Sequence, residues 1–509
     1  MTDDVDRIAD PNRHPHPEEG NAQGCREECD GPALDRPESS DHASTSTGWR
    51  DSEDGWRLDR RDLLRVGAAG VAALAGCSGQ DGGDGNDTST GPDRPAADAD
   101  DRDDTDQRES IPHAEAYGTV VDVVRDAGVS ADGEESIVPM LEANAGDDTL
   151  LYFPPGEYLM DDHWTLPAFE HLGVVGEDAT IVPEQNYFGY LFIFGLPDAG
   201  ASDLLFEGFD FDFTAPNTAP RPLQAQIDDG LTVRDVSVAG TSGTARFDVT
   251  TPEGSGTVTR LEMPDGMEIV ENLDVPPGGG NPDGVGVLVG PANRGNLRFE
   301  ECRVDGFPGN GLYASPSNGP IEVIGGHFAN NGIASVRVSS PATVRDVTVR
   351  CDEAPAGFRN MRGIRLRHGE SVLVENCRIV MEDLTYTDGG LVIEQGMESA
   401  TVRNVEIDCS VDDVPAIHVK SPDHDVSDAA IDFEDVSVTG DAGRGSAVQI
   451  SARANCHLNN LDLEQSGPDR NGIYLVRTTD SFIRNSTFDV TGEPIVLEES
   501  QVQRRNNRF

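Results

Sequence analysis

The sequence predicts an all-β chain folded as a parallel β-solenoid, and two repeated patterns predict it. The first is apolar, any residue, then Asn, Asp or Gly, followed by apolar, any residue and apolar, as in Val374–Ile379 and Val402–Ile407. The second is Gly, apolar, any residue and apolar, as in Gly363–Leu366 and Gly472–Leu475. Short alternating strands repeated in units of 20 to 30 residues indicate stacked coils. A β-sandwich would not repeat the glycine pattern in every unit.

The spacing of the first pattern supports this interpretation. From Phe299 onward its copies follow at steps of 24, 21, 30, 28, 31, 25 and 25 residues, counting a variant at Val323. Copies begin at Phe206, Val233, Phe299, Val344, Val374, Val402, Phe433, Leu458 and Ile483. The steps are irregular, so we expect loops of different lengths between strands that keep one register.

The first part of this region carries a family resemblance. Val121–Val123, the helical stretch Ser136–Ala145 and Tyr152–Tyr158 resemble the entry segment of pectate-lyase-like β-helices, which include tailspike-type and polygalacturonase-like proteins. The resemblance covers roughly residues 117 to 500. It implies a single-stranded right-handed parallel β-helix over residues 111–509, with a short N-terminal helix capping the open end, where unpaired strand edges would otherwise recruit neighbours.

One stretch interrupts the period. Residues 240–282 are rich in Gly and Pro, and the step from Val233 to Phe299 is 66 residues long. We expect an inserted loop or hairpin here, leaning over one face of the solenoid.

The cysteine positions predict free thiols. Cys302 and Cys377 share one coil position three coils apart, and Cys351 and Cys409 share another two coils apart. At about 4.8 Å per coil, these separations of about 14 and 10 Å exceed the ~7 Å Cα limit for a disulfide. We expect buried, unbridged cysteines.

Two short motifs before the predicted solenoid indicate export. Arg60 and Arg61 precede a short apolar run, and the run ends in Leu74–Cys77; these resemble a twin-arginine signal and a lipobox. The resemblance implies export in the folded state and a lipid on Cys77, which would anchor the protein to the outer face of the cytoplasmic membrane. The predicted parts are a disordered acidic extension (1–58), the signal (59–77) and a disordered tether (78–110).

The net charge excludes one class of function. The chain has 93 acidic and 38 basic side chains, for a net charge of -55, and residues 111–509 alone hold 65 acids against 26 bases. Nucleic-acid binding needs clustered cations, so such a partner is excluded. Lys420 is the only lysine, and Lys-poor, Asp-rich surfaces resemble those of haloarchaeal proteins. Molar salt would screen the self-repulsion, since the Debye length is then about 3 Å.

Strand alternation places a set of polar side chains outward on the glycine-pattern strands. Cations are concentrated in this set, although the protein has few, and three successive coils supply a patch about 10 Å tall. Arginine forks bind carboxylates and aromatic faces suit sugar rings, so we predict that the patch binds a uronate-containing polysaccharide. The predicted outward residues are Tyr313, Arg365, Arg367, Glu394, His418, Lys420, Gln449 and Tyr474.

The same residues suit a lyase. β-Elimination needs a cation to neutralise the uronate carboxylate and a base to remove the C5 proton; Lys420, His418 or Arg365 is the candidate base. Glu394 would help to hold a cation or lower a pKa. Lyases of the family that this sequence resembles use Arg or Lys with bound calcium. The resemblance is therefore compatible with a calcium cofactor, and no other cofactor is expected.

Two alternatives remain open. Asn281–Val285 resembles the first polygalacturonase motif, so Asp283 is a further substrate-binding candidate. The paired aspartates of that family are replaced by Gly309–Leu312, which removes the carboxylates that hydrolysis needs and disfavours a glycoside hydrolase. The second alternative is a non-catalytic carbohydrate-binding, adhesion or surface protein. The chain is expected to be a monomer or, as in tailspike-like relatives, a homotrimer.

Overall fold

A computed structural model describes residues 110–240, 245–264, 266, 284–354, 358, 360–423 and 429–509. The predictions for Arg60, Arg61, Cys77, Asp283 and the three N-terminal parts before residue 110 lie outside these residues. Two short helices precede or interrupt the first strands: η1 (Ala114–Ala116) and α3 (Val138–Asn144).

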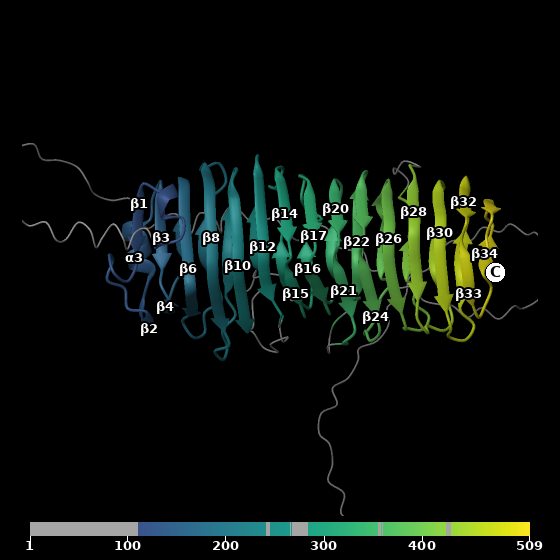
Figure 1. Cartoon of the computed structure of the whole chain (residues 1–509), viewed down its shortest axis with the longest axis horizontal. Helices are drawn as coiled ribbons and strands as arrows, with labels where there is room; N and C mark the ends of the chain where they lie inside the picture. The colour runs from purple at the N-terminus through teal and green to yellow at the C-terminus, as the bar shows by residue number, and fades with distance from the viewer. Residues whose placement is uncertain are drawn as a thin grey trace, which may run out of the picture. The chain divides into compact units, whose positions relative to one another are not determined.

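All strand pairings between named strands are parallel and fall into two sheets, whose strands lie side by side in chain order (Figure 1). Among the described residues, sheet B has 13 strands: β5 (Trp164–Leu166), β7 (Tyr190–Phe194), β9 (Arg221–Gln226), β11 (Ala245–Thr250), β13 (Val285–Leu288), β16 (Asn310–Tyr313), β19 (Ala334–Val338), β22 (Arg362–Gly369), β25 (Leu391–Met397), β27 (Ile417–Val419), β29 (Ser446–Ser451), β31 (Asn471–Val476) and β34 (Ile495–Glu498).

In the described part of the chain, sheet A has 22 strands: β1 (Thr119–Asp122), β2 (Asp132–Ser136), β3 (Thr149–Phe153), β4 (Gly156–Met160), β6 (Phe169–Pro183), β8 (Ala201–Phe213), β10 (Leu231–Gly240), β12 (Ser255–Met263), β14 (Asn296–Glu300), β15 (Arg303–Asp305), β17 (Ile321–Ile324), β18 (His327–Ala329), β20 (Ala342–Arg345), β21 (Thr348–Cys351), β23 (Val372–Glu375), β24 (Arg378–Met381), β26 (Ala400–Cys409), β28 (Ile431–Thr439), β30 (Cys456–Gln465), β32 (Ser481–Arg484), β33 (Thr487–Val490) and β35 (Val502–Arg505). The fold is therefore the predicted right-handed parallel β-helix.

The first sequence pattern marks a single inward column of the stack. Its members are direct partners in neighbouring coils, and each is buried, which confirms the predicted register although the coils differ in length. The column runs through Phe299, Val323, Val344, Val374, Val402, Phe433, Leu458 and Ile483.

The polar third residue of the pattern is where each coil bends. Asn376 and Asn404 have positive φ angles of 55° and 51°. Asn and Asp tolerate this left-handed conformation better than most residues. The side chains also bond from coil to coil, because Asn376 Nδ2 donates to Asp346 Oδ1 at 3.0 Å and Asn404 Nδ2 donates to Asn376 Oδ1 at 2.7 Å. The polar residue of the first pattern therefore marks a bend that recurs at the same position in successive coils.

The second pattern needs glycine because neighbouring coils approach closely where each strand of sheet B begins. A Cβ on Gly363 would lie 2.6 Å from the carbonyl oxygen of Gly390, and one on Gly311 would lie 2.7 Å from that of Ser335. No side chain fits in such a gap.

The predicted inserted loop is wrong for residues 245–263. These residues form β11 and β12, and Val258 pairs with Val233 on one side and with Phe299 on the other. They are an ordinary coil that the pattern missed because Arg260, with φ at 50°, occupies the place usually taken by Asn, Asp or Gly. Most of residues 264–283 lie outside the described part of the chain.

The core changes in composition along the stack. The coils of β3 to β8 contain a cluster of phenylalanines, in which the rings of Phe206 and Phe209 are 5.0 Å apart. Later coils are filled mainly by Val, Ile and Leu, with single phenylalanines such as Phe299 and Phe433. In the last coil the inward column ends in the exposed Arg504, the partner of Ile483.

Two further predictions are confirmed. Helix α3 lies within the predicted span and buries Met140 and Leu141 against the first coils. The cysteines of the described region are free and buried: Cys302, Cys351, Cys377, Cys409 and Cys456. Neither helix among the described residues has the length and apolar character needed to cross a bilayer.

Candidate functional site

Five of the eight predicted outward residues of sheet B lie in one column: Tyr313, Arg365, His418, Gln449 and Tyr474. Each residue of this column is the direct partner of the next in consecutive strands, and their inward neighbours, such as Ile364 and Leu366, are fully buried. We call this line the outer column; it contains Tyr313, Arg337, Arg365, Val392, His418, Gln449 and Tyr474. Arg337 stands in the same alternation but was not among the predicted residues.

A second outward line lies two residues further along the strands. Glu394 follows the inward Ile393, and Lys420 follows the inward Val419. Arg367 reaches the same line across a register shift between β22 and β25. The five predicted residues of the patch therefore do come together from three successive coils.

Glu394 sits at the centre of these charges. Arg365 Nε donates to its Oε1 at 2.7 Å, and Lys420 Nζ donates to the same oxygen at 3.1 Å. Arg367 Nη1 is 4.0 Å from Oε2. The predicted open patch is wrong in one respect, because Arg365 and Glu394 are each only 3% exposed. Among the cations at this place, Arg367 and Lys420 reach solvent furthest, with side chains that are 18% and 20% exposed.

A second carboxylate completes the arrangement. Asp388 Oδ2 lies 2.7 Å from Lys420 Nζ and accepts from Arg362 Nη2 at 3.1 Å. Neither Asp388 nor Arg362 was among the predicted residues. Arg362 stands one residue before Gly363 and Asp388 two residues before Gly390, the glycines of the second pattern in neighbouring coils, and this nearness was the available signal. We call the full set the charged cluster: Arg362, Arg365, Arg367, Asp388, Glu394, His418 and Lys420.

Both carboxylates are held ionised. Burial by itself would raise their pKa values, but the neighbouring cations outweigh it. Arg362 and Lys420 lower the pKa of Asp388, and Arg365 and Lys420 lower that of Glu394. The carboxylates thus act as fixed anions that hold the cations in place.

His418 has the geometry of a base. Its Nδ1 lies 2.9 Å from the backbone oxygen of Asp388. A carbonyl only accepts, so Nδ1 carries the hydrogen, and Nε2 is the acceptor in the neutral ring. Burial lowers the pKa of His418 below its ordinary value of 6.5. The ring is therefore neutral near pH 7, with Nε2 able to take a proton.

A buried arginine ties the backbone of the cluster together. Arg453, 2% exposed, follows β29 and reaches back over two coils. Its Nη1 donates to Met397 O at 2.6 Å, and its Nη2 and Nε donate to Glu394 O and Lys420 O, each at 3.4 Å. Arg453 was not predicted, because its contacts with residues 33 to 59 positions away leave no local pattern in the sequence.

The remaining predicted residues lie in the outer column but away from the cluster. The Arg337 guanidinium lies 4.4 Å from the centre of the Tyr313 ring and covers one of its faces. The Tyr474 hydroxyl donates to Glu498. Gln449 is half-buried between His418 and Tyr474.

The cluster does not suit calcium. Asp388 and Glu394 already pair with arginine and lysine groups, and these cations would repel a second positive charge. Among the described residues, no group of three or more His, Cys, Asp or Glu side chains is placed to hold a metal.

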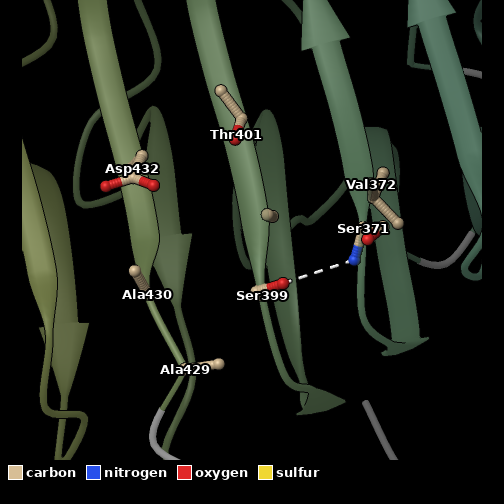
Figure 2. A pocket seen from close by; sticks show the side chains of 8 residues that line it. Ser371, Val372, Ser399, Thr401, Ala429, Ala430 and Asp432 are labelled. Carbon is tan, nitrogen blue, oxygen red and sulfur yellow. Dashed lines mark hydrogen bonds between the residues drawn. The ribbon is translucent and has the colours of Figure 1, made fainter.

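A separate shallow depression of about 330 Å³ lies where β23, β26 and β28 begin in sheet A. Figure 2 shows its hydroxyl and alanine lining, with the Ser371 N–H donating to Ser399 Oγ at 3.3 Å. Its carboxylate, Asp432, is bound to His457 Nδ1 at 2.8 Å. No residue of the charged cluster lines it. The lining residues are Ser371, Val372, Ser399, Ala400, Thr401, Ala429, Ala430 and Asp432.

No protein-family model matches the chain, and no curated protein sequence matches it. Several solved structures are similar. The A-module of the mannuronan C-5 epimerase AlgE4 of Azotobacter vinelandii has 13% identity and a TM-score of 0.43, covering 76% of this chain and 97% of its own. The Streptococcus pneumoniae surface adhesin PfbA has 12% identity and a TM-score of 0.42, covering 77% and 97%. The GH87 α-1,3-glucanase catalytic unit of Streptomyces thermodiastaticus has 12% identity and a TM-score of 0.34, covering 77% and 68%. At such identities and TM-scores, these likenesses say nothing about the activity of this chain.

Proposed function

We propose that the charged cluster binds the carboxylates of a uronate-containing polysaccharide. One observation carries the proposal: four cations and two carboxylates meet on three adjacent coils, in a region with 65 acids and 26 bases. An acidic surface repels polyanions elsewhere, so an anionic chain is favoured at this place. Arg367 and Lys420 make the contacts, since they are the cations that reach solvent, and Asp388 and Glu394 hold Lys420 in position beforehand.

We further propose that the bound glycan is cleaved by β-elimination. His418 Nε2 takes the C5 proton, the C4–C5 double bond forms, and the C4–O bond breaks; the departing oxygen takes a proton from water. Arg367 and Lys420 stabilise the charge that develops on the uronate carboxylate. Among the predicted bases His418 fits best, because Arg365 and Lys420 are engaged as donors to Glu394.

We also propose that the chain is exported by the twin-arginine signal at Arg60 and Arg61 and anchored through a lipid on Cys77. The β-helix would then work at the cell surface, where polysaccharides are met. Mass spectrometry of the membrane fraction, with and without Cys77→Ser, tests the anchor: the lipid mass should disappear in the variant.

Reversal of one exposed cation tests the binding. Arg367→Glu should weaken binding to polygalacturonate in molar salt by about 10- to 100-fold, because a hydrogen bond to a charged group contributes about 1.5–3 kcal/mol. The measurement is isothermal titration calorimetry or retention on an immobilised glycan. Arg403→Glu is the matched control: Arg403 is exposed on sheet A, where it pairs with Glu375, and the variant has the same net charge. An equal loss in both variants would show that net charge, not the cluster, governs binding.

Elimination is separable from binding alone. A double bond formed in the product absorbs in the ultraviolet, and this absorbance is followed over a panel of uronate glycans. Retained binding with neither absorbance nor new reducing ends would favour the non-catalytic alternative, a surface protein that recognises the glycan.

A further inference from the structure

The loop that carries Asp388 also presents an aromatic ring to solvent. Tyr386, two residues earlier, is 62% exposed, and within the described ranges the only other large hydrophobic side chain so exposed is Phe509. The aromatics predicted for sugar contact are less available, since Arg337 covers one face of Tyr313 and Tyr474 is bound to Glu498.

The exposure of Tyr386 does not come from a loosely held loop. Its carbonyl accepts from Met361 N at 2.7 Å, and the hydroxyl of Thr385 donates to Phe358 O at 2.9 Å. The Gly389 N–H in turn donates to the hydroxyl of Thr387 at 3.1 Å. Below the loop, Leu384 packs against the buried group formed by Cys351, Phe358 and Met361. The ring is thus presented from a backbone that is bonded on both sides of it.

The loop is part of the charged cluster through its next residues. Met361, which holds the Tyr386 carbonyl, directly precedes Arg362. Asp388 bonds Arg362 and Lys420 with its carboxylate and His418 with its backbone oxygen. A single exposed tyrosine is ordinary on a protein surface. Tyr386 differs from an ordinary exposed tyrosine because it lies two residues from Asp388, which contacts three members of the cluster.

We propose that Tyr386 is a stacking platform for a sugar ring at the edge of the charged cluster. This inference rests on the proposed function and deepens it. The C–H face of a pyranose would lie on the phenol ring while the carboxylate of the same or the next sugar meets Arg367 and Lys420. Tyrosine offers a large apolar face and has few torsions to immobilise, so contact there costs little conformational entropy.

The test compares three variants by isothermal titration calorimetry with a hexamer of galacturonate and one of mannuronate, in molar salt. Tyr386→Ala should weaken binding of the preferred hexamer by about tenfold, the equivalent of about 1.4 kcal/mol. Tyr386→Phe should bind within about twofold of the parent, because stacking uses the ring and not the hydroxyl. Phe509→Ala removes another exposed ring, 72% exposed and far along the stack, and should bind like the parent. Circular dichroism confirms that each variant is folded.

Three outcomes would overturn this inference, and they are distinguishable. Unchanged binding in Tyr386→Ala, together with weak binding in Arg367→Glu, would remove the platform and leave the proposed function intact. An equal loss in Tyr386→Phe and Tyr386→Ala would show that the hydroxyl makes the contact. Absence of binding of either hexamer to the parent protein would overturn the proposed function itself.

Discussion

Replacing Arg453 with alanine should lower the free energy of unfolding by about 3–5 kcal/mol. The guanidinium is 2% exposed and donates to the backbone oxygens of Glu394, Met397 and Lys420. Alanine leaves these carbonyls buried without that donor, and each loss costs about 1–3 kcal/mol. Denaturant unfolding followed by circular dichroism, at the salt concentration used for the binding assays, measures the change.

The matched control is Arg378→Ala. Arg378 is 55% exposed and lies 3.6 Å from Glu406. Exposed ion pairs contribute little, so this variant should unfold within about 0.5 kcal/mol of the parent. If Arg453→Ala lay equally close to the parent, water must reach the three carbonyls, and Arg453 would not be what ties the coils together.

Replacing His418 with alanine should slow elimination by about 10²- to 10⁴-fold while leaving glycan affinity within a few-fold. His418 is assigned to proton removal, whereas Arg367 and Lys420 make the contacts with the carboxylate. Burial lowers the pKa of His418, so its neutral form persists below pH 6.5. The elimination rate should therefore be level above pH 6.5 and fall as the pH drops through the pKa of the folded protein.

The measurement is the initial rate of ultraviolet absorbance increase between pH 4.5 and 8, in both proteins. A His418→Ala variant that keeps the parent rate would show that another group is the base. A parent rate that stays low up to pH 7 and rises only toward pH 8 would also show that the base is another group, since His418 is already neutral over that range.

Most of the fold was predictable from the sequence because the same backbone bends recur in successive coils. Asn376 and Asn404 mark the left-handed bend, and Gly363 marks the close approach of neighbouring coils, so register was visible in spite of loops of different lengths. Where the marker was replaced, as by Arg260, a whole coil was mistaken for a loop. The prediction of each coil therefore depended on the residue types that its bend and its close contact with the next coil require.

The site was only partly predictable, for a different reason. Alternation gives the direction in which a side chain points, and it placed Arg365, Glu394 and His418 on one face. Alternation does not say what covers that face, so the burial of Arg365 and Glu394 was missed. Asp388 reaches the cluster from a loop, and Arg453 comes from another coil, so neither position follows from strand periodicity.

The uneven core gives the stack a weak end. In a solenoid each coil touches only its neighbours, so resistance to opening is a sum of local interfaces and fraying starts where these are poorest. The phenylalanine-rich coils of β3 to β8 are the cohesive end, whereas the last coil places the exposed Arg504 in its inward column. Fraying should begin there. In sheet B, β31 and β34 are the two strands beyond β29 at that end. These two strands can therefore open and re-form while the charged cluster stays assembled.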